Sequence, residues 1–416
     1  MDTTAGRPTT RHAGREAVES VRRRASGSVA IGIDVGSISS DVVALDGDGT
    51  ILLKDYRRTE GRPVETVREQ LDRVLSVFRP EQITLAVGTG AAGRLVAELL
   101  GIPFVNEVPA QAAAIAHLYP DFEAATLIEM GGQDSKLIFL EQHQGRLKLR
   151  DFALNTVCAA GTGSFLDQQA QRLGVQIEEE FGRLALQSKT VPRLAGRCSV
   201  FAKSDMIHLQ QQATPTCDII AGLCLALARG LKSNLGCGRQ FIKPVIFTGG
   251  VAANAGVVRA FEEVLDLEPG ELIVPADHFY TGALGAVLVQ RGRADEHSAV
   301  RLETARLDEY LGRRDLELAD APRRPPLPTP VLPPPQSRVH SEVLEEAGEP
   351  IEAYLGVDVG SISTNVVVMD TQRRVLAKEY LMTAGNPLRA VRTGLERAAA
   401  KVAGRVRICG AATTGS

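Results

Sequence analysis

Residues 31–40 read IGIDVGSISS, an apolar segment that ends in Asp34 and a turn of small residues. Gly36 allows the backbone to approach an anion closely, and Ser37 can donate hydrogen bonds from its amide and its hydroxyl. An acidic Asp34 beside phosphates requires a metal ion between them, and Mg²⁺ takes oxygen ligands. The motif therefore predicts a phosphate-binding turn between two strands, with an ordinary hairpin turn as the alternative.

The sequence on either side of this motif predicts paired strands followed by alternating helices and strands. Residues 41–53 contain two strand-like stretches around DGDG at 46–49, which is typical of a hairpin. Apolar residues recur at helical spacing over 63–78, behind a proline that suits a first helical turn. The same patterns predict helices over 158–173, 198–211 and 218–235, and strands over 83–87, 125–130, 136–141 and 245–247.

The opening motif occurs twice in the chain. Residues 355–364 read LGVDVGSIST and repeat residues 31–40 at an offset of 324, and the Thr-Gly pair at 89–90 recurs at 414–415. A proline-rich stretch, residues 321–335, separates the copies and predicts an extended spacer. The sequence thus predicts four regions: a disordered basic tail over 1–28, a first domain over 29–293, a linker over 294–352, and the truncated start of a second domain of the same type over 353–416. We expect this last segment to bury no core of its own and to stay partly disordered.

Composition excludes several classes of function. The 416 residues carry 47 Lys and Arg against 50 Asp and Glu, so a net charge of -3 gives no field that attracts nucleic acid or an anionic membrane. The Arg-rich N-terminus lacks the apolar segment of a secretion signal, and no run of 18 apolar residues occurs. We therefore expect a cytoplasmic protein. Its six cysteines are too few for a disulfide framework, which leaves metal binding or burial.

Two further glycine-rich loops follow predicted strands. Residues 129–136 read EMGGQDSK and, like the first motif, end an apolar strand with a glycine bend and polar residues that open the next strand. The repetition implies two pseudo-equivalent halves within one domain. Residues 248–256 read TGGVAANAG and precede a predicted helix over 257–265, where Gly249 and Gly250 leave room for a flat ring and the helix start offers amides. Together the three loops resemble the nucleotide site of the superfamily that contains actin, sugar kinases and heat-shock chaperones.

Residues 88–93 read GTGAAG and offer an alternative nucleotide-binding motif. Glu107 lies nineteen residues after Gly88. This pattern resembles a dinucleotide-binding fingerprint, but that motif belongs to the first βα turn of a parallel sheet, whereas two paired strands precede this one. Arg94 stands where a P-loop requires Lys followed by Ser or Thr. Neither alternative is favoured.

Two cysteines lie just ahead of predicted helices. Cys158 belongs to the glycine-rich run CAAGTG at 158–163, and Cys198 precedes an amphipathic segment. Backbone amides at a helix start favour an anionic sulfur. If two chains met about a two-fold axis, their four sulfurs would satisfy one 4Fe-4S cluster, while burial as inert thiols is the alternative.

In this order, the motifs DVGS, GGQDSK, CAAGTG and TGGVAAN resemble the BadF/BadG/BcrA/BcrD-type ATPases, which include activators of 2-hydroxyacyl-CoA dehydratases and ATPase subunits of benzoyl-CoA reductase. The resemblance covers about residues 29–293 and restarts at 353, as in long tandem members. It implies an α/β, actin-like ATPase (ribonuclease-H-like) fold of two pseudo-equivalent halves with the nucleotide in the cleft between them. It further implies an ATPase coupled to one-electron transfer.

The resemblance also implies cofactors, partners and site residues. ATP and Mg²⁺ would act with one 4Fe-4S cluster that bridges a homodimer, or an equivalent pairing of tandem domains, through Cys158 and Cys198. A ferredoxin or flavodoxin-like protein would donate the electron to it, and an acyl-CoA dehydratase or reductase would accept it. The implied catalytic residues are Asp34, Glu107 and Asp134. The implied ATP contacts are Asp34, Gly36, Ser37, Ser39, Gly131, Gly132, Gln133, Asp134, Gly249, Gly250, Val251 and Asn254.

The chain departs from the family pattern at two positions. Asp41 stands where the smaller activators often have Lys, and Glu129 replaces the usual aspartate ahead of the second Gly-Gly, so phosphate affinity or metal placement would be altered. For the remaining cysteines we expect core packing, with Cys217, Cys224 and Cys237 in or near a helix and Cys409 in a buried strand. Two other functions stay open: a sugar or acyl-phosphate kinase on the same fold, and a nucleotide-dependent scaffold without a redox role.

Overall fold

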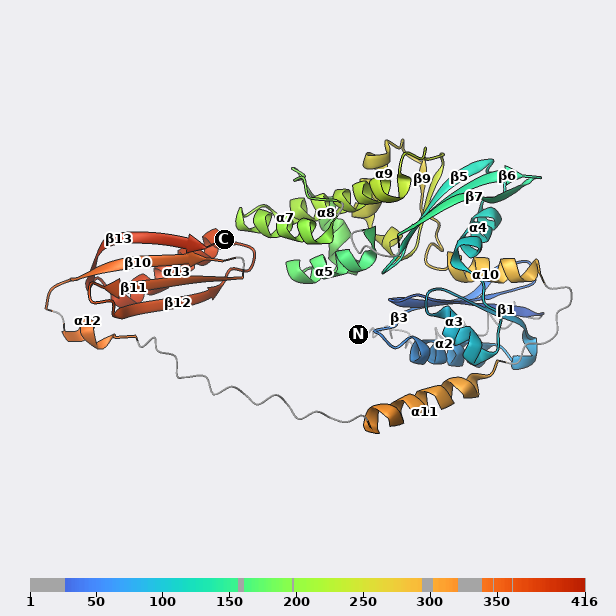
Figure 1. Cartoon of the computed structure of the whole chain (residues 1–416), viewed down its shortest axis with the longest axis horizontal. Helices are drawn as coiled ribbons and strands as arrows, with labels where there is room; N and C mark the ends of the chain where they lie inside the picture. Colours follow the sequence, from blue (N-terminus) through green and yellow to red (C-terminus); the bar gives the residue numbers. More distant parts are fainter. Residues whose placement is uncertain are drawn as a thin grey trace, which may run out of the picture.

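The computed structural model describes residues 27–155, 161–196, 198–293, 302–320, 339–346, 348–360 and 362–415. These residues contain three β-sheets, two of which lie in the region predicted as the first domain (Figure 1). The expected tail over 1–28 lies mostly outside the described residues, and so does the proline-rich stretch of the expected linker over 294–352. The described part of that linker contains the helix α11 (Thr304–Asp320), which packs against the helices Pro63–Val77 and Gly93–Leu100 and buries Leu307 there.

The first half is a four-stranded sheet in the order β3-β2-β1-β4. Its elements are β1 (Val29–Val35), β2 (Ser39–Leu45), β3 (Ile51–Arg58), β4 (Ile83–Thr89), the helices α2 (Pro63–Val77) and α3 (Gly93–Leu100), and the 3₁₀ turn η1 (Pro80–Gln82). Alternate residues of β1 point to opposite faces, so Ile31 and Ile33 pack against α2 and α3 while Ala30 packs against α4 (Glu107–Leu118) and α10 (Thr281–Arg291). The predicted hairpin and helix are confirmed.

The second half is a five-stranded sheet in the order β7-β6-β5-β8-β9. Its strands are β5 (Ala124–Met130), β6 (Ser135–His143), β7 (Arg146–Asn155), β8 (Val245–Thr248) and β9 (Leu272–Ile273). One face carries most of the helical elements: α5 (Gly163–Leu173), η3 (Ile177–Phe181), α6 (Gly182–Ala185), α7 (Ser199–Gln211), α8 (Thr216–Leu231), η4 (Lys232–Gly236), η5 (Gly250–Ala253) and α9 (Ala255–Leu265). The other face packs against α4.

Helix α4 lies between the two sheets and therefore places its first residue between the halves. Ala110 and Ala114 belong to the core of the first sheet, and Val108, Ala112 and Ile115 belong to that of the second. The side chain of Asn106 caps the helix by accepting from the amide of Val108 at 3.1 Å. Glu107 follows this cap directly and lies at the junction.

One helical segment within the described residues, Thr216–Gly236, is long and apolar enough to span a membrane by those two criteria. In this protein 78% of its most apolar window is buried inside the molecule, where it packs against α9 and the second sheet. It has the composition of a core helix.

The third sheet repeats the strand order of the first. It contains β10 (Ile351–Val359), β11 (Ser363–Asp370), β12 (Val375–Met382) and β13 (Val406–Gly415) in the order β12-β11-β10-β13, with the helix α13 (Pro387–Val402) against it and α12 (Glu342–Glu346) ahead of it. The expectation that residues 353–416 bury no core was wrong, because Ala353, Val366, Leu376 and Ala398 are fully buried in a common cluster.

The cysteine expectations are corrected in part. Cys224 is buried, and burial raises the pKa of its thiol to about 12. Cys217 is half-buried at the start of α8. Cys237 is exposed. A π-helical turn follows α8, and Cys237 is the left-handed residue that ends this turn. Cys409 is also exposed, because β13 presents most of its side chains to solvent.

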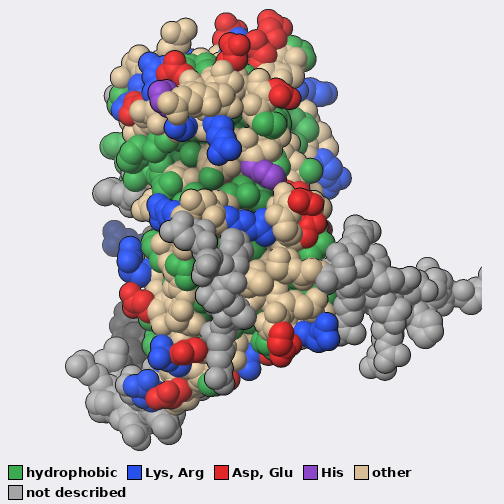
Figure 2. Space-filling view, turned by 90° about the vertical axis from the view of Figure 1, so that its right-hand side faces the viewer, with side chains coloured by type: hydrophobic (Ala, Val, Ile, Leu, Met, Phe, Trp, Pro, Cys, Tyr) green, Lys and Arg blue, Asp and Glu red, His purple; other side chains and the backbone are tan. Residues whose placement is uncertain are grey.

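Acidic and basic side chains are interspersed over the face shown in Figure 2.

Candidate functional site

Two adjacent hollows of about 240 Å³ and about 520 Å³, which share several lining residues, lie between the halves of the first domain. Both are lined by the two predicted phosphate loops, with Ile38 and Ser39 from the first and Gly131 and Gly132 from the second, and both reach Gly250. The smaller hollow is lined by five acids, Asp34, Asp41, Glu107, Glu129 and Asp134. The larger hollow extends toward α5 and α9 and is lined by Asp167, Glu178 and Glu179. Their combined size is typical of a site for a small-molecule ligand.

The two phosphate loops have the same backbone turn and approach each other closely. The amide of Gly36 donates to the carbonyl of Ser39 at 2.9 Å, and the amide of Gly131 donates to the carbonyl of Asp134 at 3.1 Å. A Cβ atom at Gly132 would lie 2.2 Å from the side chain of Ile38, so glycine is required where the second loop meets the first. The predicted residues Gly36, Ser37, Gln133 and Asp134 all line the smaller hollow.

A buried ammonium group organises the carboxylates of this hollow. Lys136 Nζ lies 2.7 Å from the carboxylate of Glu107, 2.8 Å from that of Glu129 and 2.8 Å from that of Asp134. Burial lowers the pKa of Lys136, but the surrounding carboxylates, Glu129 foremost, outweigh it and raise the pKa above its usual value. Lys136 therefore stays charged and fixes carboxylates from β5, the second loop and α4.

The smaller hollow holds more carboxylate charge than this ammonium neutralises. Burial, with a further contribution from Glu107, raises the pKa of Asp34 to about 8, and burial raises that of Glu129 to about 7. Asp41 is buried and its Oδ1 has no hydrogen-bond partner within the described residues, and burial together with Asp34 raises its pKa well above the ordinary value. Carboxylate oxygens are the ligands that Mg²⁺ prefers, but no three of the described acids have the arrangement of a metal site by themselves.

The third predicted loop closes the same cleft from the side of β8. Gly249 has φ of 87°, and a Cβ there would lie 2.4 Å from the carbonyl oxygen of Met130, so only glycine fits between the two strands. Asn254 caps α9 by accepting from the amides of Gly256 and Val257 at 3.0 and 3.3 Å. Gly250, Val251 and Asn254 line the larger hollow.

The rival motif at 88–93 supports the first loop structurally. The amide of Ala92 donates to the carbonyl of Val35 at 2.8 Å, and a Cβ at Gly90 would lie 2.4 Å from Asp34 Oδ1. These contacts hold the end of β1, where Asp34 lies, and they explain the glycine without a dinucleotide.

The cysteine segment is bonded to the second phosphate loop. The amides of Gly163 and Ser164, at the start of α5, donate to the carbonyls of Gly131 and Gly132 at 2.9 and 2.8 Å. The hydroxyl of Ser135 donates to the carbonyl of Gly161. Cys158 itself lies outside the described residues, three positions before this connection.

Cys198 is half-buried at the N-cap position of α7. Val200 and Phe201 beside it are each 65% exposed, an unusual position for large apolar side chains. Among the described residues no group of three or more His, Cys, Asp or Glu has the arrangement of a metal site. Within the described chain, Cys198 is therefore not part of a complete cluster site.

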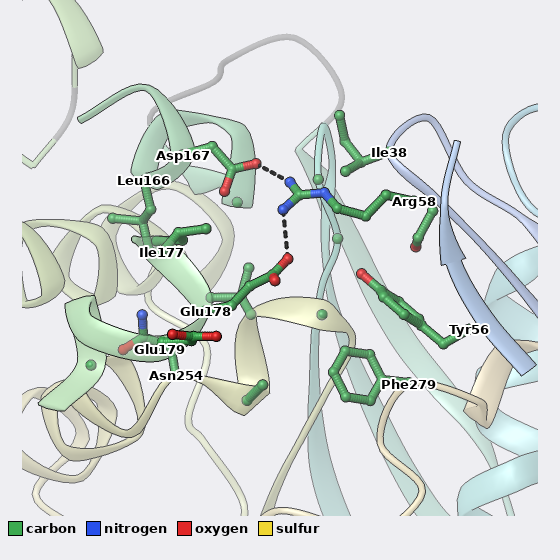
Figure 3. A pocket seen from close by; sticks show the side chains of 18 of the residues that line it. Ile38, Tyr56, Arg58, Leu166, Asp167, Ile177, Glu178, Glu179, Asn254 and Phe279 are labelled. Atoms are coloured by element: carbon green, nitrogen blue, oxygen red, sulfur yellow. Dashed lines mark hydrogen bonds and ion pairs between the residues drawn. The ribbon is translucent and has the colours of Figure 1, made fainter. Parts of the chain in front are cut away.

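The structure adds site residues that the sequence did not predict. Lys136 is the first, although its spacing of seven from Glu129 matches that of Asp41 from Asp34 and could have revealed it. Tyr56 and Phe279 line both hollows with ring centroids 4.6 Å apart. Arg58 lines the larger hollow and pairs with acids of the second half (Figure 3). No local sequence signal connects Arg58 with those acids.

Comparison with known proteins agrees with this geometry. The model of the BadF/BadG/BcrA/BcrD ATPase family matches residues 31–289. The chain belongs to this family. It is 33% identical over 265 residues to the (R)-2-hydroxyglutaryl-CoA dehydratase activating ATPase of Acidaminococcus fermentans, covering 62% of this chain and 95% of that protein. It is 34% identical over 264 residues to the activator of lactoyl-CoA dehydratase of Anaerotignum propionicum, covering 62% of this chain and 95% of the relative.

Solved structures give the same answer for the fold. The crystal structure of component A of the Acidaminococcus fermentans dehydratase has a TM-score of 0.58 at 30% identity and covers 64% of this chain and all of that one. The Clostridium difficile activator of 2-hydroxyisocaproyl-CoA dehydratase, with bound ADPNP, has a TM-score of 0.55 at 30% identity, over 65% of this chain and all of the other. This family member therefore has the actin-like ATPase fold and is an ATP-binding protein.

Proposed function

We propose that the chain is an ATP-hydrolysing activator that drives low-potential one-electron transfer to an acyl-CoA dehydratase or reductase. One observation carries the proposal: the second phosphate loop is hydrogen-bonded through Gly131 and Gly132 to Gly163 and Ser164, directly after the cysteine segment. A change at the phosphates would therefore reach the cysteine segment through two backbone hydrogen bonds. The names of the relatives as dehydratase activators support the choice of acceptor.

In this proposal the nucleotide lies along the two hollows. Its phosphates would contact the loops at Gly36, Ser37, Ser39 and 131–134, and its nucleoside would lie by Gly249, Gly250, Val251 and Asn254. The excess carboxylate in the smaller hollow fits Mg²⁺, which would be held by Asp34 and Asp134 and would neutralise phosphate charge. Glu107 would orient the attacking water, since Lys136 holds its carboxylate at 2.7 Å.

Cys158 and Cys198 would hold a 4Fe-4S cluster between two chains, and such a cluster accepts and releases one electron at a time. The position of Cys198 fits, because the residue is half-buried at the start of a helix, where a second chain could reach it. The exposed Val200 and Phe201 would be covered in a homodimer. A ferredoxin or flavodoxin-like donor and a cytoplasmic location complete the proposal.

We also propose that residues 353–416 open a second domain of the same type. The strand order of the third sheet equals that of the first. Asp358 and Asn365 face each other across β10 and β11 as Asp34 and Asp41 do across β1 and β2. A second nucleotide cleft would need a partner for this sheet comparable to the second half.

The experiment is anaerobic purification of the full chain with measurement of iron, labile sulfide and ATPase activity. We expect about two iron atoms per chain, lost in Cys158→Ala and Cys198→Ala but kept in Cys237→Ala, a matched control at an exposed cysteine outside the proposed ligand set. Protein that hydrolyses ATP without iron would instead favour a kinase or a scaffold.

A further inference from the structure

Arg58 joins the two halves across the nucleotide cleft. It is the last residue of β3 in the first half, and its guanidinium lies 2.7 Å from the carboxylate of Asp167 in α5 and 2.8 Å from that of Glu178 in η3 (Figure 3). All three side chains line the larger hollow. Arginine suits this position because its planar fork serves two carboxylates at once.

The backbone at Arg58 is also fixed to the first phosphate loop. Arg58 faces Ser39 in the register of β2 and β3. The next residue, Thr59, donates its amide to the carbonyl of Ile38 at 2.8 Å, and its hydroxyl lies 3.3 Å from the carbonyl of Ser37 and 3.2 Å from that of Ile38. A movement of the first loop therefore moves Arg58.

Helix α5 is consequently connected to both phosphate loops. Its N-terminal amides, Gly163 and Ser164, bind the second loop, and Asp167 one turn further along binds Arg58 beside the first loop. The first connection consists of two backbone hydrogen bonds of 2.9 and 2.8 Å. The second is an ion pair whose side chains are 38% and 32% exposed, so water and salt weaken it and it can open and close.

We propose that Arg58 is a positioning residue that holds the two halves closed over the bound nucleotide and ties the first phosphate loop to α5. Loss of its ion pairs lets the cleft open more often and shortens the residence of the nucleotide. This inference rests on the nucleotide site of the proposed function, and it does not depend on the iron–sulfur cluster.

The test is the rate at which a fluorescent ADP analogue leaves the full chain in stopped flow. We expect Arg58→Ala to speed release about 3- to 10-fold, the range for two partly exposed ion pairs, and Arg58→Lys to lie between it and the unaltered chain. Lys54→Ala is the matched control, since Lys54 lies on the same strand and pairs with Asp277 at 2.6 Å outside both hollows. It should leave release unchanged.

A double-mutant cycle separates the ion pair from a general loss of stability. Once Arg58 is removed, Asp167→Asn should have a much smaller effect on release than it has alone, and the exchanged pair Arg58→Asp with Asp167→Arg should recover slow release. The proposed role of Arg58 is overturned if Arg58→Ala and the unaltered chain release the analogue at the same rate. It is also overturned if the effects of the two substitutions on the release rate are fully additive. If the unaltered chain does not bind the analogue, the proposed nucleotide site is wrong, and so is the role of Arg58 that rests on it.

Discussion

The two hairpins of the proposed nucleotide cleft share one backbone plan and differ in the residue that faces their carboxylate across the strands. In the first, Asp34 faces Asp41 across β1 and β2, and in the second, Glu129 faces Lys136 across β5 and β6. Each pair is seven residues apart. The second hairpin thus supplies its own cation, whereas the first has a second acid where that cation would be. The shared backbone places a carboxylate at the same position in both hairpins. The residue that faces it across the strands decides whether its charge is neutralised by a side chain of the hairpin or must be neutralised by a ligand.

The third hairpin offers an intermediate case. Asp358 faces Asn365 across β10 and β11, and the amide of Asn365 donates to the carboxylate of Asp358 at 3.2 Å. Here a neutral donor satisfies the acid without a charge. The three hairpins therefore place an acid, an amide and an ammonium group, respectively, opposite a carboxylate. A single substitution at the facing position can give one hairpin the chemistry of another.

Removal of the ammonium from the second hairpin should have the largest effect. In Lys136→Met the carboxylates of Glu107, Glu129 and Asp134 lose their common partner, and we expect the free energy of unfolding to fall by about 3 to 5 kcal/mol. Urea unfolding monitored by circular dichroism measures the change. Adding Glu129→Gln should recover part of the loss, because one buried charge is then removed, and an equal or lower stability of the double variant would contradict this account.

Two equivalent glycines distinguish the first sheet from the third. A Cβ at Gly32 in β1 would lie 2.2 Å from the carbonyl oxygen of Ala283 in α10, whereas at Gly356 in β10 the nearest atom would be the carbonyl oxygen of Val367 at 4.0 Å. Gly32→Ala should therefore destabilise the first sheet by about 2 kcal/mol or more, and Gly356→Ala should change the third by less than about 0.5 kcal/mol. Hydrogen exchange of the β1 and β10 amides reports each sheet separately. Similar losses at both would show that an unseen contact covers Gly356.

Prediction from the sequence succeeded where the signal was local. The DVGS and GGQDSK motifs, their strands and the helix behind Pro63 depend on neighbouring residues, and the structure confirms them. Contacts between distant segments were missed: Arg58 meets Asp167 and Glu178 across separations of 109 and 120 residues. Exposure of Cys237 and Cys409 was missed for the same reason, since burial depends on what packs over a strand or a helix end.

The pH dependence of stability should reflect the uncompensated acids of the cleft. The folded-state pKa values of Asp34 and Glu129 are raised from 3.8 and 4.5 to about 8 and about 7, so the folded protein binds protons more tightly than the unfolded chain. Their contribution to stability is full below the unfolded values and is lost as the pH rises through about 7 and 8. Metal-free, nucleotide-free protein should lose stability between pH 5 and pH 9, by up to about 1.4 kcal/mol per pH unit for each group while the pH lies below its folded-state pKa. Asp34→Asn should show a smaller loss, and an unchanged slope in this variant would exclude Asp34 as the source.

Conversion of the first hairpin toward the third should have the smallest effect and the opposite sign. In Asp41→Asn the buried acid beside Asp34 becomes a neutral amide that can donate to it, as Asn365 does to Asp358. We expect metal-free protein near pH 8 to gain about 1 kcal/mol, a rise of roughly 2 to 4 °C in the thermal midpoint. Asp48→Asn, at an exposed site in the turn between β2 and β3, is the control and should be neutral. A lower midpoint for Asp41→Asn in metal-free protein would contradict this account, because it would show that the site accommodates the carboxyl group of Asp41 better than an amide.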